Sequence, residues 1–524
     1  MSAGGRRVAW VGRGDVNAFF GLMLDNMTQI VILAGILIEI FGFSEEIVLT
    51  RIIPGTAVGV LVGDLVYTWM AVRLARREGR DDVTAMPLGI DTPSLFGLTF
   101  GVLGPALRAT GDETLAWQIG MALMVSMGLL KVVCAYAAEW VRRVVPRAGL
   151  LGSIAAVAIL LIAFLPALEI FGEPVVGFLS LSIVLACLVA RIALPAAFPG
   201  AFLAAALGTV AFYTLGAAGL THHLVPPLAE ALMLHPALPL PTLGFLDGLG
   251  AMLPYLPIAI PFALATVVGG IDNTESAAAA GDEYSTRDVV MTEGLATFVA
   301  GLCGGVIQTT PYIGHPAYKE MGGRAGYTAA TALFIGLGGF LGYLSFFVTF
   351  IPAAAVAPIL VFIGIEICAQ AFQASPPKHA PAVALSFLPV IASLLVIQIG
   401  TTLSNVGLGP ASLTGETAAT YRSLHLLSGG FIFSALLWGG ALALIIDGAL
   451  LRAAAFMTAG ALAALFGIIH SPLPGGEMFL PWRIAERAPV LLGSAYLVFA
   501  GVLLLFHRAR WRPPDRTGQG APDR

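Results

Sequence analysis

Long apolar stretches separated by short polar connections fill almost the whole chain. A helix needs about 20 residues to cross the hydrocarbon core of a bilayer. Apolar segments of roughly that length lie near 18–42, 50–73, 115–140, 148–170, 174–191, 198–220, 253–280, 289–306, 326–351, 353–373, 380–400, 428–448, 451–470 and 489–507. Two shorter apolar segments, 86–107 and 308–322, are interrupted by Pro and Gly. The pattern predicts an all-α, polytopic membrane protein with up to sixteen membrane segments, the fourteen plus the two.

The composition excludes several classes of protein. Hydrophobic residues make up 58% of the 524 and charged residues 11%, which leaves too few charges to cover a soluble protein of this size. The four cysteines lie far apart in apolar segments, and their spacing suits neither a disulfide framework nor a metal site. The sequence contains no Gly-x-x-x-x-Gly-Lys-Ser/Thr phosphate loop. We expect no enzyme activity, no cofactor other than H⁺ or Na⁺ as a coupling ion, and no nucleic-acid partner.

The basic residues indicate the orientation of the chain, because cytoplasmic connections are enriched in Lys and Arg. With the N-terminus inside, 21 of the 27 basic residues fall at cytoplasmic ends. The connection 221–252 contains no Lys or Arg, as expected on the outer side. The pattern predicts a multi-pass protein of the inner or plasma membrane with both termini in the cytoplasm.

The two halves of the chain repeat one arrangement. Residues 18–220 contain seven segments with the third interrupted, and residues 253–448 do the same. Because seven is odd, the second half enters the membrane from the opposite side, so the repeat is inverted. The breaks at 85–94 and 308–316 each contain two prolines, which favour extended backbone before a short helix. Matched breaks are the best pointer to a transport site, although proline kinks without a ligand would give the same pattern.

Carboxylates lie inside the apolar segments. Asp272 and Glu275 occur within a run of about 25 apolar or small residues, where a carboxylate is costly and usually lines a cavity or an ion pathway. The pair Asp25-Asn26, in the first segment, repeats the pair Asp272-Asn273. This repetition supports a transport site built from both halves.

Several short motifs carry a resemblance to a known family. They are Ile271-Asp272-Asn273-Thr274, Glu293-Gly294-Leu295-Ala296-Thr297, Thr309-Thr310 with Tyr312-Ile313, and Gly322-Gly323-Arg324-Ala325-Gly326-Tyr327-Thr328. Over about residues 15–450 the chain resembles the nucleobase–cation symporter-2 superfamily, the xanthine/uracil/ascorbate permeases, and within it the hypoxanthine/adenine/guanine branch. It departs from the family at Gly314-His315, where members usually carry Glu or Gln. It also carries Asp25-Asn26 near the place of the Gln-His pair that several branches have.

The resemblance implies a 7+7 inverted-repeat transporter fold with two broken helices that contain short antiparallel strands. The core domain would comprise 14–145 and 253–352, and the gate domain 148–220 and 353–450. About two extra C-terminal helices would occupy 451–507, followed by a disordered cytoplasmic tail at 508–524. The gate domain could also form a homodimer contact.

The resemblance implies that Asp272 binds the substrate; the alternative is a structural hydrogen bond between helices. Glu275 lies one helical turn later, and because neighbouring buried carboxylates resist carrying two charges, it is the expected proton site. His315 could donate to a substrate or relay protons. Asp91 could bind ligand or cap the following half-helix. The other expected substrate contacts are Glu275, Gly314, Tyr312, Thr310, Thr92 and Ile90. The expected proton-coupling or polar network comprises Glu275, Asp25, Asn26, Gln29 and Asn273.

These features predict a secondary active transporter that takes up a purine-like nucleobase, or a similar small planar heterocycle, with protons by alternating access. Its partners would be this substrate, the coupling ion and membrane lipid. The first alternative is a sulfate, bicarbonate or carboxylate transporter of the same fold. The second is a non-transporting membrane receptor or enzyme, for which the sequence offers neither a nucleophile nor a sizeable soluble domain.

Overall fold

A computed structural model describes residues 9–192, 194–195, 198, 200–221, 234, 236–344 and 350–509 of the chain. Within these residues, eight helices are long and apolar enough to cross a membrane, and a bent pair of helices would make a ninth. Three shorter apolar helices of 10–17 residues accompany them. The chain is therefore an integral, multi-pass membrane protein of the predicted all-α class. The predicted tail falls outside the described residues from 510 onwards.

The elements of the first half lie where the hydropathy pattern places them. They are α1 (Asp15–Gly35), α2 (Glu45–Ile47), α3 (Ile53–Glu78), β1 (Leu88–Ile90), α4 (Thr92–Leu98), α5 (Gly104–Thr110), α6 (Glu113–Val144), α7 (Arg147–Val157), α8 (Phe164–Gly172), α9 (Pro174–Val184) and α10 (Gly200–Ala217). Helices α1, α4, α7 and α9 continue into π-helical stretches, and another precedes α3; these stretches are Ile36–Ile40, Thr99–Leu103, Ala158–Ala163, Leu185–Val189 and Val48–Ile52.

The second half follows the same order and then adds two helices. Its elements are α12 (Phe245–Gly248), α13 (Leu256–Ala279), α14 (Thr286–Leu302), β2 (Thr309–Pro311), α15 (His315–Glu320), α16 (Gly326–Leu341), α18 (Ala353–Ala374), α19 (Ala380–Leu385), α20 (Phe387–Asn405), α21 (Gly415–Ser428), α22 (Phe431–Ile446), α23 (Leu450–Leu465) and α24 (Ala488–Arg508). Both predicted breaks contain a short strand followed by a helix.

The hydropathy pattern did not predict helix α21. The chain between 400 and 428 was expected to be a connection, but it contains α21, which meets α22 at an angle of 72°. The two helices are separated by Gly429 and Gly430, and the positive φ of Gly430 (64°) is a conformation that glycine adopts without strain. The residues of α21 are half-buried or exposed and include Glu416 and Arg422, so hydropathy alone gave no signal for it.

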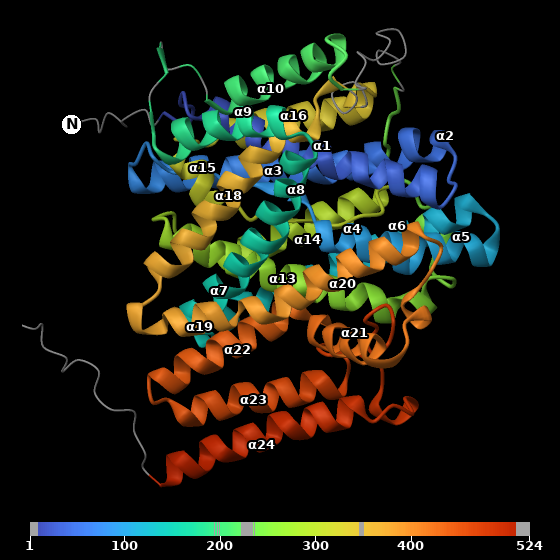
Figure 1. Ribbon diagram of the computed structural model, residues 1–524, viewed down its shortest axis with the longest axis vertical. Coiled ribbons are helices and arrows are strands. Elements are labelled where there is room, and N and C mark those ends of the chain that lie inside the picture. Colours follow the sequence, from blue (N-terminus) through green and yellow to red (C-terminus); the bar gives the residue numbers. More distant parts are fainter. Residues whose placement is uncertain are drawn as a thin grey trace, which may run out of the picture. The chain divides into compact units, whose positions relative to one another are not determined.

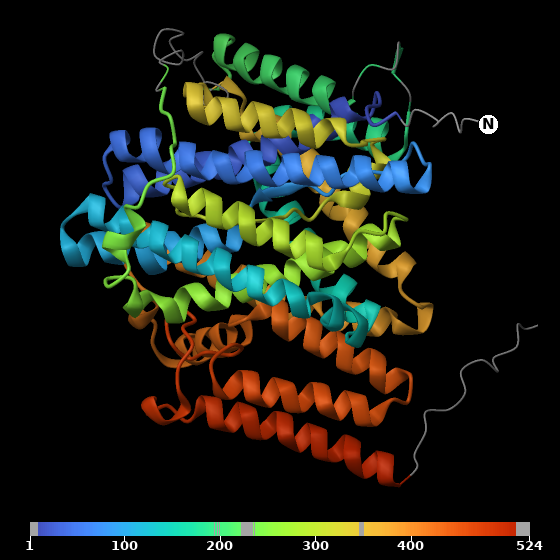
Figure 2. The same cartoon turned by 180° about the vertical axis from the view of Figure 1, so that it is seen from behind.

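The chain divides into two compact units. The first comprises residues 1–143 and 154–370, and the second 144–153 and 371–524. In the first unit, Figures 1 and 2 show α3 (blue) between α16 (yellow) and α14 (yellow-green), although these helices come from opposite halves of the sequence. In the second unit, α22 packs against α23 and α23 against α24 (orange to red). The predicted division into core and gate domains stays a prediction.

Close helix contacts in the first unit depend on small residues. A Cβ atom added to Gly128 of α6 would lie 2.6 Å from the backbone nitrogen of Phe298 on α14. A Cβ atom added to Gly339 of α16 would lie 2.6 Å from the Cβ of Ala57 on α3. Such contacts let backbones approach closely, which is how helices associate where the hydrophobic effect between them is weak. Each half thus packs its second long helix against the other half.

The two strands pair with each other and join the two breaks. They run antiparallel, with Leu88 opposite Pro311, Gly89 opposite Thr310 and Ile90 opposite Thr309. Flanking backbone bonds extend the pairing, from Tyr312 N–H to Pro87 C=O (2.7 Å) and from Asp91 N–H to Gln308 C=O (3.1 Å). The outward-facing backbone groups of so short a ladder need partners from the helices around it.

Two asparagines, one from each half, form hydrogen bonds with the outward-facing backbone groups of the strands. The Nδ2 of Asn26 donates to Leu22 C=O, four residues earlier in α1, and to Leu88 C=O (3.3 Å), while its Oδ1 accepts from Ile90 N–H (3.3 Å). The Nδ2 of Asn273 donates in the same way to Gly269 C=O, four residues earlier in α13, and to the strand carbonyl of Pro311 (2.9 Å). The repeated Asp-Asn pair thus fixes each strand to the first long helix of its own half.

We predict that Asn26→Leu and Asn273→Leu each lower the free energy of unfolding by about 1–3 kcal/mol, because each leaves buried strand groups without a partner. Thermal unfolding in detergent, followed by loss of the monodisperse peak on size-exclusion chromatography, measures this. Thr28→Val and Thr274→Val are matched controls, because these hydroxyls donate to carbonyls four residues earlier in the same helices. If the asparagine variants unfold at temperatures no lower than those of the control variants, Asn26 and Asn273 do not stabilise the strands in this way.

Candidate functional site

The paired strands are flanked by buried ionisable side chains from several helices. On one side, the Asp25 carboxyl group of α1 interacts with the side chains of Gln29, one turn later, and Tyr312, directly after β2. Asp25 is 2% exposed and Tyr312 6%. Asp64 of α3 accepts from Leu88 N–H (2.9 Å), so a second carboxylate completes the outer edge of β1. Asp25 therefore connects the first helix of one half to the strand of the other.

The opposite side holds a buried ion pair. Lys131 of α6 lies 2.8 Å from Oε1 of Glu293 on α14, and both side chains are 0% exposed. The same ammonium group donates to Thr309 C=O (3.1 Å) and to Thr297 Oγ1 (3.3 Å). Lys131 thus supports the outer edge of β2, as Asn273 does.

Sequence reasoning named neither Lys131 nor Glu293 as a site residue. The signal was present, because a single lysine in an otherwise apolar segment of a membrane protein is a functional-site hypothesis by default. The periodicity of the segments does not indicate that α6 and α14 meet, so the pairing itself was not predictable from the pattern. The close approach of the helices at Gly128 brings the two charges together.

The start of α4 carries a further polar chain. Asp91 accepts from Ser94 N–H (3.0 Å) and from the Ser94 hydroxyl, which is the geometry of an N-cap. Gln308, before β2, donates to Ser94 Oγ and to Phe262 C=O, and its Oε1 accepts from Thr266 of α13 (3.2 Å). The structure thus places Asp91 in the capping role that the sequence left as one of two alternatives; ligand binding by Asp91 stays a prediction.

Asp272 and Glu275 occupy different surroundings. Asp272, next to Asn273, is 1% exposed within α13. Glu275 is paired with Arg142, whose Nε lies 2.7 Å from its Oε2, and Arg142 also bonds Glu283 on the connection after α13. Glu275 therefore has a cationic partner toward the end of α13, and its expected role as proton site stays a prediction.

His315 belongs to a different cluster. Its Nε2 lies 3.1 Å from Thr84 C=O and 3.2 Å from Oδ2 of Asp282, so Nε2 carries the proton that these acceptors require. Asp282 also binds Arg80 (3.1 Å) and Lys319 (2.6 Å) and accepts from Thr84 N–H (3.0 Å). The cluster joins the connections after α3 and α13 to α15.

The remaining predicted contacts lie on the ladder or beside it. Ile90 and Thr310 belong to the strands, and Thr92 begins α4. Gly314 precedes α15, and a Cβ atom there would lie 2.7 Å from the ring of Tyr318. All the predicted site residues come from the first unit. Among the described residues, no group of three or more His, Cys, Asp and Glu side chains could hold a metal ion.

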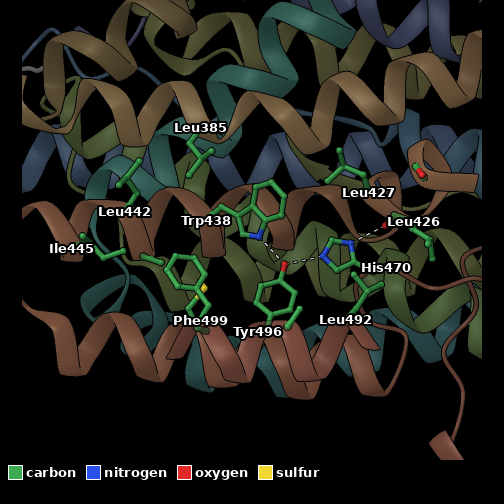
Figure 3. A pocket seen from close by; sticks show the side chains of 14 residues that line it. Leu385, Leu426, Leu427, Trp438, Leu442, Ile445, His470, Leu492, Tyr496 and Phe499 are labelled. Atoms are coloured by element: carbon green, nitrogen blue, oxygen red, sulfur yellow. Dashed lines mark hydrogen bonds between the residues drawn. The ribbon is translucent and has the colours of Figure 1, made fainter. Parts of the chain in front are cut away.

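The second unit contains a separate cavity of about 580 Å³, shown in Figure 3. Leucine and aromatic side chains line it, together with one hydrogen-bonded chain. Trp438 Nε1 donates to Tyr496 Oη (2.7 Å), and Tyr496 Oη lies 2.8 Å from His470 Nε2. His470 Nδ1 lies 2.8 Å from Leu426 C=O, which can only accept, so Nδ1 carries a proton. In the neutral ring Nε2 then accepts from the Tyr496 hydroxyl. These polar groups therefore satisfy one another.

The paired breaks, the repeated edge contacts and the long apolar helices together define an all-α, polytopic transporter fold. No protein-family model matches the chain, and no curated protein matches it. Among solved structures, the chain is similar to the transmembrane domain of a cyanobacterium bicarbonate transporter, BicA, with a TM-score of 0.43 and 15% identity over 74% of this chain and 97% of that chain. A likeness of this size assigns neither a family nor a substrate. The comparisons give no support to the nucleobase-permease branch.

The Asp282 cluster leads to a prediction about acid stability. Burial alone would raise the pKa of the Asp282 carboxyl, but His315 and Lys319 hold that pKa below its ordinary value of 3.8. A lowered folded-state pKa gives stability that is complete above the ordinary value and is lost as the pH falls through the folded value. Asp282→Ala should therefore lower the free energy of unfolding by about 1.5–3 kcal/mol at neutral pH, and by progressively less below pH 3.8.

Thermal unfolding at a series of pH values compares Asp282→Ala with the unaltered protein. Asp288→Ala, an exposed aspartate in the first turn of α14, is the control and should change little at any pH. A stability difference that persists unchanged at low pH would contradict the cluster's electrostatic role.

Proposed function

We propose that this protein is a secondary active transporter that moves a small solute together with protons, with the solute bound at the paired strands β1 and β2. The observation that carries this proposal is the ladder itself, formed by two breaks from opposite halves and flanked by buried carboxylates from α1, α3 and α14. Non-helical backbone at membrane depth is tolerated where it lines a site or is buried in protein. Broken segments in matching places of two repeats are where transporters bind substrate.

The charges around the ladder support the proposed proton coupling. Asp25, Asp64, Asp91 and Glu293 are buried or half-buried there, with Lys131 as the counter-charge, and Asp272 is buried on α13 next to Asn273. Several negative charges held close together in a low-dielectric region repel one another, and taking up protons relieves that repulsion. A carboxylate whose proton occupancy differs between the two faces of the membrane couples solute movement to a pH gradient.

Two substrate classes fit such a site. A nucleobase or similar heterocycle would offer N–H groups to Asp272 and amide-like hydrogen bonds to the strand backbone. A small anion is the second candidate, and the buried cation Lys131, bound at Thr309 of β2, is the specific observation in its favour. The protein matched among solved structures is described as a bicarbonate transporter, which belongs to this second class.

Uptake into proteoliposomes tests the proposal and separates the two classes. The panel comprises radiolabelled purines, pyrimidines, bicarbonate, sulfate and small carboxylates, with and without a pH gradient. We expect the gradient to drive accumulation of one class and a protonophore to abolish it. Absence of gradient-driven uptake for every solute would remove the proposed coupling.

Asp272→Asn tests the central residue of the predicted site. Loss of one hydrogen bond to a charged group should lower the apparent affinity for substrate about ten- to a hundredfold. Glu139→Gln, in an exposed ion pair on α6, is the control and should transport normally. Unchanged uptake by Asp272→Asn would exclude this residue from substrate binding.

A further inference from the structure

Lys131 and Glu293 form an ion pair between α6 and α14, and Lys131 also contacts residues outside this pair. An ammonium group has three N–H donors, and Lys131 uses them on Glu293, Thr309 C=O and Thr297 Oγ1. One of these acceptors is the backbone of β2. The ammonium group is therefore part of the wall around the ladder as well as a partner for the acid.

The two carboxylate oxygens of Glu293 are buried and face different neighbours. Its Oε1 lies 2.8 Å from the Lys131 ammonium group, whereas its Oε2 faces α13, where the side chain of Thr266 also interacts with the carboxyl group. Gly270 of α13 leaves room beside this oxygen, because a Cβ atom there would lie 2.7 Å from Oε2. A buried carboxylate whose charge is balanced by one cation can take up a proton when that cation binds another anion.

The titratable groups around Glu293 come from every neighbouring element. They are Lys131 and Cys134 of α6, Tyr67 of α3 and Asp91 before α4, with the Arg142–Glu275 pair further along α6 and α13. Among these groups Lys131 is the cation in contact with Glu293, and Asp91 is the anion that also acts on Lys131. The charge of Lys131 is thus balanced chiefly by the group that would take up the proton.

We propose that Glu293 carries the coupling proton and that Lys131 binds the substrate, which is a small anion; the inference rests on the proposed function. Glu293 takes up one proton on its carboxylate and becomes a neutral acid. The ammonium group of Lys131 keeps its charge, and the anion replaces the carboxylate as its partner. Release of the anion and loss of the proton on the other side restore the ion pair.

This exchange of partners determines the net charge that crosses the membrane in each transport step. One proton and one monovalent anion cross together, so the loaded and empty carriers hold the same net charge. Transport of a monovalent anion by the unaltered protein is then electroneutral. A purely structural ion pair would leave both the charge balance and the pH dependence to other residues.

The first experiment uses the unaltered protein in proteoliposomes, with formate, acetate and bicarbonate as anions and adenine and uracil as heterocycles. We expect an inside-alkaline pH gradient to drive anion uptake, and a potassium diffusion potential set with valinomycin to leave the rate unchanged. Coupled uptake of adenine or uracil alone would overturn the anion assignment while leaving the proposed function intact. Uptake of no solute would overturn the proposed function itself.

The second experiment compares Glu293→Gln, Lys131→Gln and the double variant. Glu293→Gln should lose stimulation by the pH gradient while keeping anion counterflow. Lys131→Gln should raise the KM for the anion about ten- to a hundredfold. The double variant removes both charges of the pair and should fold even where a single variant does not. Gradient-driven anion uptake by the double variant with its KM unchanged would overturn the proposal.

Arg143→Gln is the matched control, because Arg143 forms an exposed ion pair with Glu139 one turn earlier on the same helix. It should keep the KM and the pH response of the unaltered protein. A response to the diffusion potential in the unaltered protein would also overturn the proposal, without depending on any variant.

Discussion

Backbone hydrogen bonding at membrane depth is the constraint on which the rest of this structure depends. Two strands of three residues each cannot satisfy their outer edges, and unpaired backbone groups in hydrocarbon are very costly. Asn26 and Asp64 satisfy the edge of β1, while Asn273 and Lys131 act on β2. Each of these side chains comes from a different long helix. The ladder can therefore persist only while those helices hold their places around it.

The same requirement explains why so many polar groups lie in an apolar protein. A side chain that reaches the ladder is ionised or strongly polar, and each such group needs a partner of its own. Lys131 forms an ion pair with Glu293, and Gln308 forms hydrogen bonds with Ser94 and Thr266. The residues that support the strand backbone therefore also hold the charges near the proposed substrate position. The mechanism proposed above uses groups that the fold already requires.

The sequence predicts much of this architecture because its signals are local. Apolar length gives the helices, paired prolines give the breaks, and the repeated Asp-Asn pairs mark corresponding helices. The antiparallel strands came from the family resemblance. Contacts between distant helices carry no local signal, so Lys131–Glu293 and Arg142–Glu275 were not predicted. Helix α21 was missed because its mixed polar surface resembles that of a connection.

The two halves also differ in a way that bears on function. Leu88 and Pro311 face each other in register, yet only Leu88 has an N–H group to donate. That N–H binds Asp64 of α3, so the acid on the second long helix of the first half is tied to backbone. Pro311 has no N–H group that needs an acceptor. The acid of α14, Glu293, is paired with Lys131 instead. An acid held by a side chain can exchange its partner without breaking the ladder, whereas an acid held by the strand cannot. The asymmetry therefore favours Glu293, in the second half, for the proposed exchange of partners.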